Sequence, residues 1–398
     1  MTLTLDMIQS MALAVVILMG GQSIRKRVSF LERFCIPAPV IGGIIFALFT
    51  LAMKQAGVLE FQFDTTLQKV FMTAFFTTVG FTASFKLLKK GGKQVVIFLV
   101  LAVVLVCMQN VVGVGFAKAF GINPLIGLST GSVPMTGGHG TSGAYAPVFE
   151  NAGASGASAV AMASATFGLI AGSLIGGPLG KRLIEKNNLL GTNSTDEMVS
   201  DIQNDTDEIN LVSSSRFLGA ACQIIVAMGL GTIVSAILTK TGMTFPPYIG
   251  AMFAAAIIRN ISDASSTFSI NSVEIDVIGE TSLSIFLAMA LMSLKLWQLA
   301  DLAGPMVIML VAQVTLMALF AYFVTFNVMG RDYEAAVMAC GHCGFGMGAT
   351  PNAMANMSAL TQKYQVAPAA FFILPLVGSL FIDFFNAAII TGFMNLFV

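Results

Sequence analysis

Two glycine-rich stretches, one in each half of the 398-residue chain, contain the residue types best suited to binding a small charged ligand. They read GSVPMTGGHGT at 131–141 and GHCGFGMGATPN at 341–352. Glycine lets the backbone approach a ligand closely and adopt positive φ. Free backbone N–H groups at a helix start favour a carboxylate, whereas freed carbonyls and hydroxyls suit a cation such as Na⁺. The sequence therefore predicts that the two stretches form one binding site for a carboxylate and a cation.

The predicted ligand-binding residues come from both stretches and from the last apolar segment. Asp383 is included because a charged group inside an apolar helix is unfavourable and usually functional. The site prediction comprises Ser132, Thr136, Gly137, Gly138, His139, Gly140, Thr141, Gly344, Gly346, Gly348, Thr350, Asn352 and Asp383. The predicted Na⁺ ligands are Asp383, Asn386, Thr166 and Ser379. Gln109, Asn110 and Gln313 either line the site or join helices by hydrogen bonds.

The composition places this site in a membrane. The chain is 56% apolar and 10% charged, whereas about 25% of the residues of a soluble protein are charged. Its net charge of zero gives no reason to expect a nucleic-acid partner. We expect a lipid bilayer around the chain, no cofactor and no enzymatic activity. Ten apolar segments are long enough to be read as spans: 5–24, 35–53, 66–84, 94–118, 157–180, 216–239, 245–260, 276–294, 303–329 and 366–397.

The two glycine-rich stretches fall between spans and are predicted to form re-entrant hairpins, at about 123–156 and 333–362. Non-helical backbone at membrane depth must be buried in protein or line a cavity. The predicted fold class is an all-α polytopic membrane protein with two inverted-topology repeats of five spans, each containing one hairpin. The repeats are 1–184 and 216–398, joined by an acidic hydrophilic linker at 185–215.

Short sequence matches in the same order support the repeat. IPAPVIGG at 36–43 corresponds to FPPYIGA at 245–251, and FKL at 85–87 corresponds to LKL at 294–296. Because each repeat has an odd number of spans, the second is inserted upside down, and the two hairpin tips can meet near the midplane.

The lysines and arginines predict the orientation. With both termini outside and the linker in the cytoplasm, fifteen of the 20 basic residues face the cytoplasm. The other five, Lys54, Lys69, Lys118, Lys240 and Lys295, face out. This split is the one that the positive-inside rule favours.

Two short motifs resemble those of enzymes, but they are weaker evidence than the paired glycine-rich stretches. Gly127-Leu-Ser129-Thr-Gly131 fits the pattern of a serine nucleophile with His139 nearby, which leaves an intramembrane serine protease as an alternative. Cys340-Gly-His-Cys343 spells a dithiol motif but lacks the βαβ context that the redox chemistry needs. His139 and His342 also leave open a proton-coupled transporter of the same architecture.

The chain resembles the bacterial sodium/glutamate symporter family. The resemblance rests on TGGHGT, ATFGLIAGSLIGGP, SLSIFLAMALMSLKLW, AAVMACGHCGFGMGATPNAMANM and IPAPVIGG. It implies Na⁺-driven uptake of L-glutamate across the inner membrane by an elevator-type movement, in a homodimer. A transporter of the same fold for another carboxylate remains an alternative.

Overall fold

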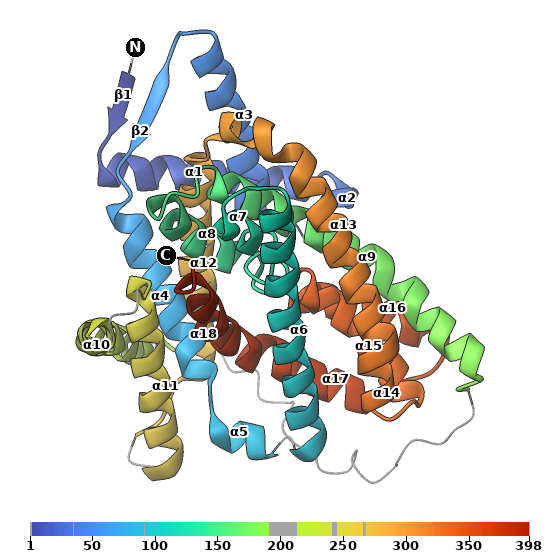
Figure 1. The fold of residues 1–398 in the computed structure, drawn as a ribbon. Coiled ribbons are helices and arrows are strands. Elements are labelled where there is room, and N and C mark those ends of the chain that lie inside the picture. The colour runs from blue at the N-terminus through green and yellow to red at the C-terminus, as the bar shows by residue number, and fades with distance from the viewer. Residues whose placement is uncertain are drawn as a thin grey trace.

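The computed structural model describes residues 2–34, 36–90, 92–190, 213–240, 245–265 and 268–397. Most of the predicted linker, 191–212, lies outside these residues. The described chain is predominantly helical, and eight of its helices are long and apolar enough to cross a membrane. Figure 1 shows the arrangement. The chain is therefore a polytopic helical membrane protein.

The helices of the first half are α1 (Met7–Arg25), α2 (Ser29–Arg33), α3 (Ala38–Gln55), α4 (Thr66–Thr82), α5 (Phe85–Lys90), α6 (Gly92–Ala119), α7 (Pro124–Leu128), α8 (Gly138–Asn151) and α9 (Ala157–Asn187). Those of the second half are α10 (Ser214–Thr239), α11 (Pro247–Ser265), α12 (Ser272–Met292), η1 (Leu296–Leu302), α13 (Ala303–Leu319), η2 (Phe320–Thr325), α14 (Phe326–Val328), α15 (Tyr333–Gly346), α16 (Thr350–Lys363), α17 (Pro368–Pro375), η3 (Leu376–Phe381) and α18 (Ile382–Met394).

Two of the ten predicted spans are not among the eight. They correspond to α4, which has 17 residues, and to α11, which carries Arg259 and Asp263 near its end. These two helices pack against each other, and each also packs against α10. A shorter or partly charged helix can be accommodated there, because neighbouring protein surrounds much of its surface.

Two short strands were not predicted. β1 (Thr2–Leu5) pairs in parallel with β2 (Glu60–Phe63), with Thr2 opposite Glu60 and Leu5 opposite Phe63. Phe61 and Phe63 stack on each other and contact the ring of Phe46 in α3. The pair projects from one end of the molecule, opposite the end where α5 lies (Figure 1).

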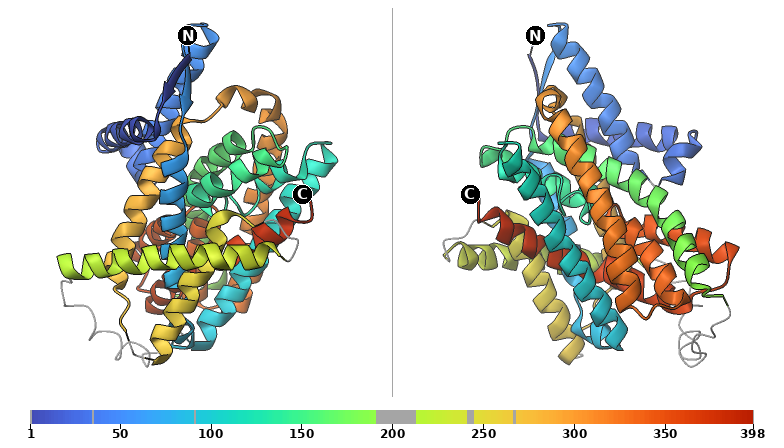
Figure 2. Two further views of the ribbon diagram at one scale, coloured as in Figure 1. Left: turned by 90° about the vertical axis from the view of Figure 1, so that its left-hand side faces the viewer. Right: turned by 45° about the vertical axis from the view of Figure 1, so that its right-hand side comes forward.

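The helices form two groups. One, which we call the flanking bundle, comprises α1, α3, α4, α10, α11 and α12, which pack mainly against one another. Glycine allows close crossing in both of its outer helix pairs. A Cβ on Gly42 would lie 2.1 Å from the carbonyl oxygen of Ile17 in α1, and one on Gly250 would lie 2.2 Å from that of Gly231 in α10. Figure 2 shows α10 running across α11.

The other group, the hairpin bundle, comprises α6–α9 and α13–α18 together with η2 and η3. Here α9 lies along α15 because its glycines leave room for the backbone of that helix. A Cβ on Gly168 would lie 2.2 Å from the Met347 carbonyl oxygen, and one on Gly172 would lie 2.7 Å from that of Cys343. Small residues at such positions are the usual means of close helix packing in membranes.

The contacts between the two bundles are mainly apolar and aromatic. The rings of Phe253 and Phe384 lie 5.3 Å apart, and those of Tyr145 and Tyr248 lie 5.6 Å apart. Within the described residues, the chain passes between the bundles at the segment joining α4 to α5 and at η1. The FKL match begins α5 directly after the first crossing, and the LKL match ends at the first residue of η1.

Gly21 and Gly20 provide a matched test of close packing in α1. A Cβ on Gly21 would lie 2.1 Å from the Ala38 carbonyl oxygen, whereas one on Gly20 would meet nothing within 4 Å. Gly21→Leu should therefore destabilise the protein by about 1–3 kcal/mol, as overpacking does. Gly20→Leu, which makes the same change in helix propensity, should not. Thermal unfolding of the purified proteins measures the difference, and equal transition temperatures would contradict this packing.

Candidate functional site

Both glycine-rich stretches contain a break between two helices. In the second stretch, α15 ends at Gly346 and α16 begins at Thr350, which leaves Met347, Gly348 and Ala349 outside both helices. In the first, α7 ends at Leu128 and a series of turns leads to α8, which begins at Gly138. All of the residues from 129 to 138 except Gly137 are buried, and Gly137 is partly buried.

The two breaks meet at Gly138 and Gly348. Gly138 has a φ of +60°, and a Cβ added to it would lie 3.0 Å from the carbonyl oxygen of Gly348. Positive φ disfavours residues with a side chain, and the approach leaves little space for one. Both α8 and α16 begin close to this contact, and neither has a side chain that caps its first turn. Uncapped helix starts present N–H groups that attract anions.

The side chain of Gln109 in α6 joins the two breaks. Its Nε2 donates to the Gly346 carbonyl oxygen at 2.7 Å, and its Oε1 accepts from the Thr136 hydroxyl at 2.8 Å. The carbonyl oxygen of Gln109 accepts from Gln313 Nε2 at 2.8 Å. Gln109 and Gln313 are fully buried. One side-chain amide thus satisfies the carbonyl freed at the end of α15 and holds it beside the first break.

Ser132 is the centre of a second polar group. Its backbone N–H donates to Asn110 Oδ1 at 2.9 Å, and its carbonyl oxygen accepts from Asn386 Nδ2 at 3.3 Å. Three buried atoms of this group, Asn110 Nδ2, Ser132 Oγ and Asn386 Oδ1, find no hydrogen-bond partner among the described residues. Buried polar atoms are nearly always satisfied, so this group has the capacity to bind a ligand.

Asp383 lies one helical turn before Asn386 in α18. It follows Pro375 and the π-helical segment η3, where the regular hydrogen-bond pattern is interrupted. Proline lacks a backbone N–H, and π-helical turns are frequent at functional sites. The described residues give the partly buried Asp383 carboxylate no hydrogen bond or ion pair. An oxygen ligand of this kind suits a cation.

The two histidines occupy different surroundings. His139 Nε2 lies 3.0 Å from the Thr166 hydroxyl, so it joins the start of α8 to α9. His342 Nδ1 lies 2.9 Å from the Thr325 hydroxyl, and its ring stacks on Phe345 at 4.8 Å.

Ser129 Oγ donates to the Leu125 carbonyl oxygen at 3.1 Å. The structure thus pairs neither Ser129 with His139 nor His139 with a carboxylate, as a serine-protease triad would require.

Comparison with known proteins identifies the family. The sequence profile described as sodium/glutamate symporter matches residues 3–366. The sodium/glutamate symporter of Escherichia coli (strain K12) is 40% identical over 393 residues, 98% of each chain. That of Haemophilus influenzae is 41% identical over 394 residues, 98% of this chain and 97% of the relative. This chain belongs to the sodium/glutamate symporter family. The members named here are transporters and not enzymes.

In this symporter-family chain, the other predicted site residues lie close around the meeting point or support it. Asn352 Nδ2 donates to the Leu169 carbonyl oxygen at 2.9 Å, which ties α16 to α9. A Cβ on Gly344 would lie 2.5 Å from Ala353, so this glycine serves packing within the second hairpin. Gly137 contacts Thr141, and Thr350 faces Gly378 of η3.

Two predicted residues stand apart from this group. Gly140 faces Phe75 and Leu283 of the flanking bundle, where a Cβ would lie 3.3 Å from each side chain. Ser379, a predicted Na⁺ ligand, is exposed on η3. Among the described residues, no group of three or more His, Cys, Asp and Glu side chains is arranged to hold a transition metal.

Tyr145 is a further residue near the site, and its position in the sequence does not predict this. Its buried hydroxyl donates to the Ala387 carbonyl oxygen at 2.6 Å and lies 2.9 Å from the Thr391 hydroxyl, so it joins α8 to α18. The only sequence signal for this contact is a tyrosine within an otherwise small-residue helix. Gln109, which was expected either to line the site or to join helices, joins helices by its hydrogen bond to Gly346.

Replacing Gln109 tests the amide bridge. Gln109→Leu keeps the bulk but removes the donor to Gly346 and the acceptor for Thr136. An unsatisfied buried polar group costs about 1–3 kcal/mol, so thermal unfolding of the variant should begin at a clearly lower temperature. Met108→Leu, at the more exposed neighbouring position, is the control. A wild-type transition for Gln109→Leu would show that the bridge contributes nothing.

Proposed function

We propose that this protein takes up L-glutamate together with Na⁺ across the bacterial inner membrane. The relatives are named as sodium/glutamate symporters and match nearly the whole chain. The observation that carries the proposal is the meeting of two uncapped helix starts beside buried polar atoms without partners. This arrangement offers N–H groups to a carboxylate and oxygen atoms to Na⁺.

Within this proposal, the glutamate carboxylates bind the helix starts at Gly138 and Thr350, with Thr136, Thr141 and Ser132 contributing hydroxyl groups. Na⁺ binds near Asp383 and Asn386, and the Asn386 side chain also bonds to the Ser132 carbonyl oxygen at the first break. His139 and Thr166 hold the start of α8 in place. The assignment follows the charges, because a carboxylate ligand would repel glutamate and attract Na⁺.

Coupling to Na⁺ has a physical basis. Glutamate is a net anion, and a membrane potential that is negative inside opposes its entry. Moving one positive charge inward gains about 2.3 kcal/mol at 100 mV. Co-transport of more than one Na⁺ per glutamate makes the net movement of charge inward and positive, so the potential then drives uptake.

The repeats 1–184 and 216–398 are part of the proposal. Each half contains the same succession of a transverse outer helix, two bundle helices, a long helix, a hairpin and a final helix. Gln109 and Gln313 occupy matching positions and bond to each other. Gly42 and Gly250, which allow close helix crossing, also occupy matching positions. This pattern supports two inverted repeats whose hairpins enter from opposite sides, with both termini periplasmic and the linker cytoplasmic.

We further propose an elevator-type movement, in which the hairpin bundle carries the site past the flanking bundle. The apolar contacts between the bundles support this proposal, because such a surface can slide without breaking many hydrogen bonds. Among the described residues, the Thr82 hydroxyl donates across it to the Leu380 carbonyl oxygen at 2.8 Å, and Asn260 of α11 bonds the backbone of Ala83 and Phe85 where the chain crosses. The homodimer remains in the proposal on the strength of the family resemblance.

Proteoliposomes test the coupling. Uptake of labelled L-glutamate should require an inward Na⁺ gradient and be blocked by excess unlabelled L-glutamate. Asp383→Asn should weaken the Na⁺ dependence, because a neutral amide attracts the ion less strongly than a carboxylate does. Labelled glutamate is counted in the vesicles at a series of Na⁺ concentrations.

Three results would contradict this assignment. Uptake that follows a pH gradient in Na⁺-free buffer would favour proton coupling. Preference for another carboxylate in the competition assay would change the cargo. A wild-type Na⁺ response in Asp383→Asn would remove this residue from the ion site.

Two glycines with positive φ test the hairpin contact. Gly138→Ala introduces a Cβ 3.0 Å from the Gly348 carbonyl oxygen, whereas Gly153→Ala, at φ +91°, introduces one that meets nothing within 4 Å. Both changes strain the backbone, but only the first displaces the tips. A displacement of about 1 Å at a binding site can reduce a rate by about 100-fold. Uptake should therefore fall strongly in Gly138→Ala and little in Gly153→Ala; similar rates would place the site elsewhere.

A further inference from the structure

An apolar slot lies between the two bundles, and its lining residues belong to neither glycine-rich stretch. Its volume is about 460 Å³, within the range of about 300–1,000 Å³ of small-molecule sites. One wall is α11, with Phe253, Ala256 and Ala264 among its lining residues. The opposite wall comes from η3 and α18, with Phe381 and Phe384. Its lining contains almost no polar group, so its occupant must be apolar.

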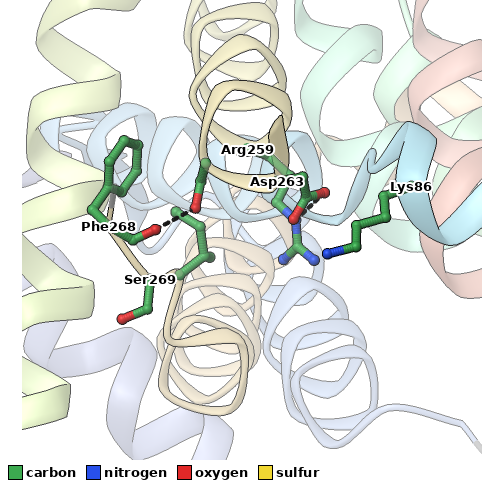
Figure 3. A pocket seen from close by; sticks show the side chains of 7 residues that line it. Lys86, Arg259, Asp263, Phe268 and Ser269 are labelled. Atoms are coloured by element: carbon green, nitrogen blue, oxygen red, sulfur yellow. Dashed lines mark hydrogen bonds and ion pairs between the residues drawn. The ribbon is translucent and has the colours of Figure 1, made fainter. Parts of the chain in front are cut away.

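A polar pocket of about 400 Å³ lies on another face of the same helix. Figure 3 shows Lys86 and Arg259 converging on it, with their nitrogen atoms directed toward each other. Asp263 also lines it, but its carboxylate is engaged by the Ser84 hydroxyl and by Arg259 Nε. The charged lining residues are two cations and one anion. Lys86 interacts electrostatically with Asp263, and Arg259 does so with Asp263 and with Asp276. Lys86 makes no hydrogen bond with the described residues.

The stretch 83–88, which joins α4 to α5 and includes the start of α5, borders both cavities. Ala83, Phe85 and Leu88 line the slot, whereas Lys86 lines the pocket. Asn260 of α11 holds this segment, since its Nδ2 donates to the Ala83 carbonyl oxygen at 2.7 Å and its Oδ1 accepts from the Phe85 N–H at 2.9 Å. The short helix α5 therefore presents apolar side chains to one cavity and a cation to the other.

We propose that this segment binds an anionic phospholipid, with an acyl chain in the slot and the phosphate at Lys86 and Arg259. The juxtaposition of an apolar slot and a cationic pocket fits a molecule with both characters. Basic pockets between helices on the cytoplasmic side of a membrane bind anionic headgroups. The lysines Lys86, Lys89 and Lys93 close to this end of the bundle are on the side that the charge distribution assigns to the cytoplasm.

The occupant follows from the two cavities taken together. A free phosphate ion would use the pocket but not the slot, and a neutral lipid or detergent would use the slot but not Lys86. An anionic phospholipid uses both. Because the slot is lined by both bundles, the bound lipid contacts the surface along which we propose that they move. Lipid binding itself does not depend on which solute is transported.

The test is native mass spectrometry of the purified full-length protein, titrated separately with phosphatidylglycerol and phosphatidylcholine. The wild-type protein should retain phosphatidylglycerol preferentially. Lys86→Gln removes a cation that makes no hydrogen bond and should weaken this binding about fivefold, the effect of one basic residue near a membrane surface. Ala264→Leu fills the slot from an exposed lining position and should also weaken it.

Two variants serve as controls. Lys89→Gln removes an exposed lysine of α5 that lines neither cavity, and Ala236→Leu adds the same bulk on an exposed face of α10. Both should retain the lipid as the wild type does. If Lys86→Gln and Lys89→Gln lost phosphatidylglycerol binding equally, the effect would come from general surface charge, and the proposed lipid site would be wrong. Equal retention of phosphatidylglycerol and phosphatidylcholine would also overturn it. So would displacement of the lipid by inorganic phosphate together with wild-type lipid binding in Ala264→Leu. Uptake measured in the same preparations separates this outcome from a failure of the proposed transport.

Discussion

The side-chain amide of Gln109 provides the hydrogen bond that the interrupted helix α15 needs at its end. A helix that stops inside a membrane protein leaves carbonyl groups without partners, and each is unfavourable unless another part of the protein satisfies it. At the end of α15 this partner is a side chain from a different helix, which also accepts from Thr136 of the other hairpin. The same two hydrogen bonds therefore make both breaks tolerable and fix their distance from each other. Much of the geometry at the tips depends on this one side chain.

The division into two bundles separates the polar groups of the hairpin breaks from the apolar contacts between the bundles. The polar groups gather inside the hairpin bundle, where Ser132, Asn110 and Asn386 meet, whereas aromatic rings such as Phe253 and Phe384 face each other across the boundary. Groups that must keep a fixed arrangement thus lie within one body. The chain crosses the boundary at the short α4–α5 segment and at η1, and the matching sequences FKL and LKL lie next to these crossings.

Much of this structure can be predicted from the sequence because the membrane restricts what a polar residue can do. The breaks at Met347–Ala349 and before Gly138 follow from glycines and hydroxyl groups inserted between long apolar runs. Which atoms meet across them does not follow, because spacing along the chain gives no register between distant helices. Gln109 was therefore recognised as polar but not as the link to Gly346. Ser379, a predicted Na⁺ ligand, lies in the π-helical segment after Pro375 and is exposed.

The packing of the two halves against each other also determines how the chain can be assembled. Helix α4 packs against α11 and α12, and α3 packs against α12, so the flanking bundle contains helices from both halves of the sequence. The hairpin bundle does the same, with α9 lying along α15. The ribosome delivers the first half long before these partners exist. Until α12 and α15 arrive, glycine faces such as that of α9 and the buried amide of Gln109 must remain in lipid or in temporary contacts. Completion of the fold is therefore a late event that depends on the last-made helices.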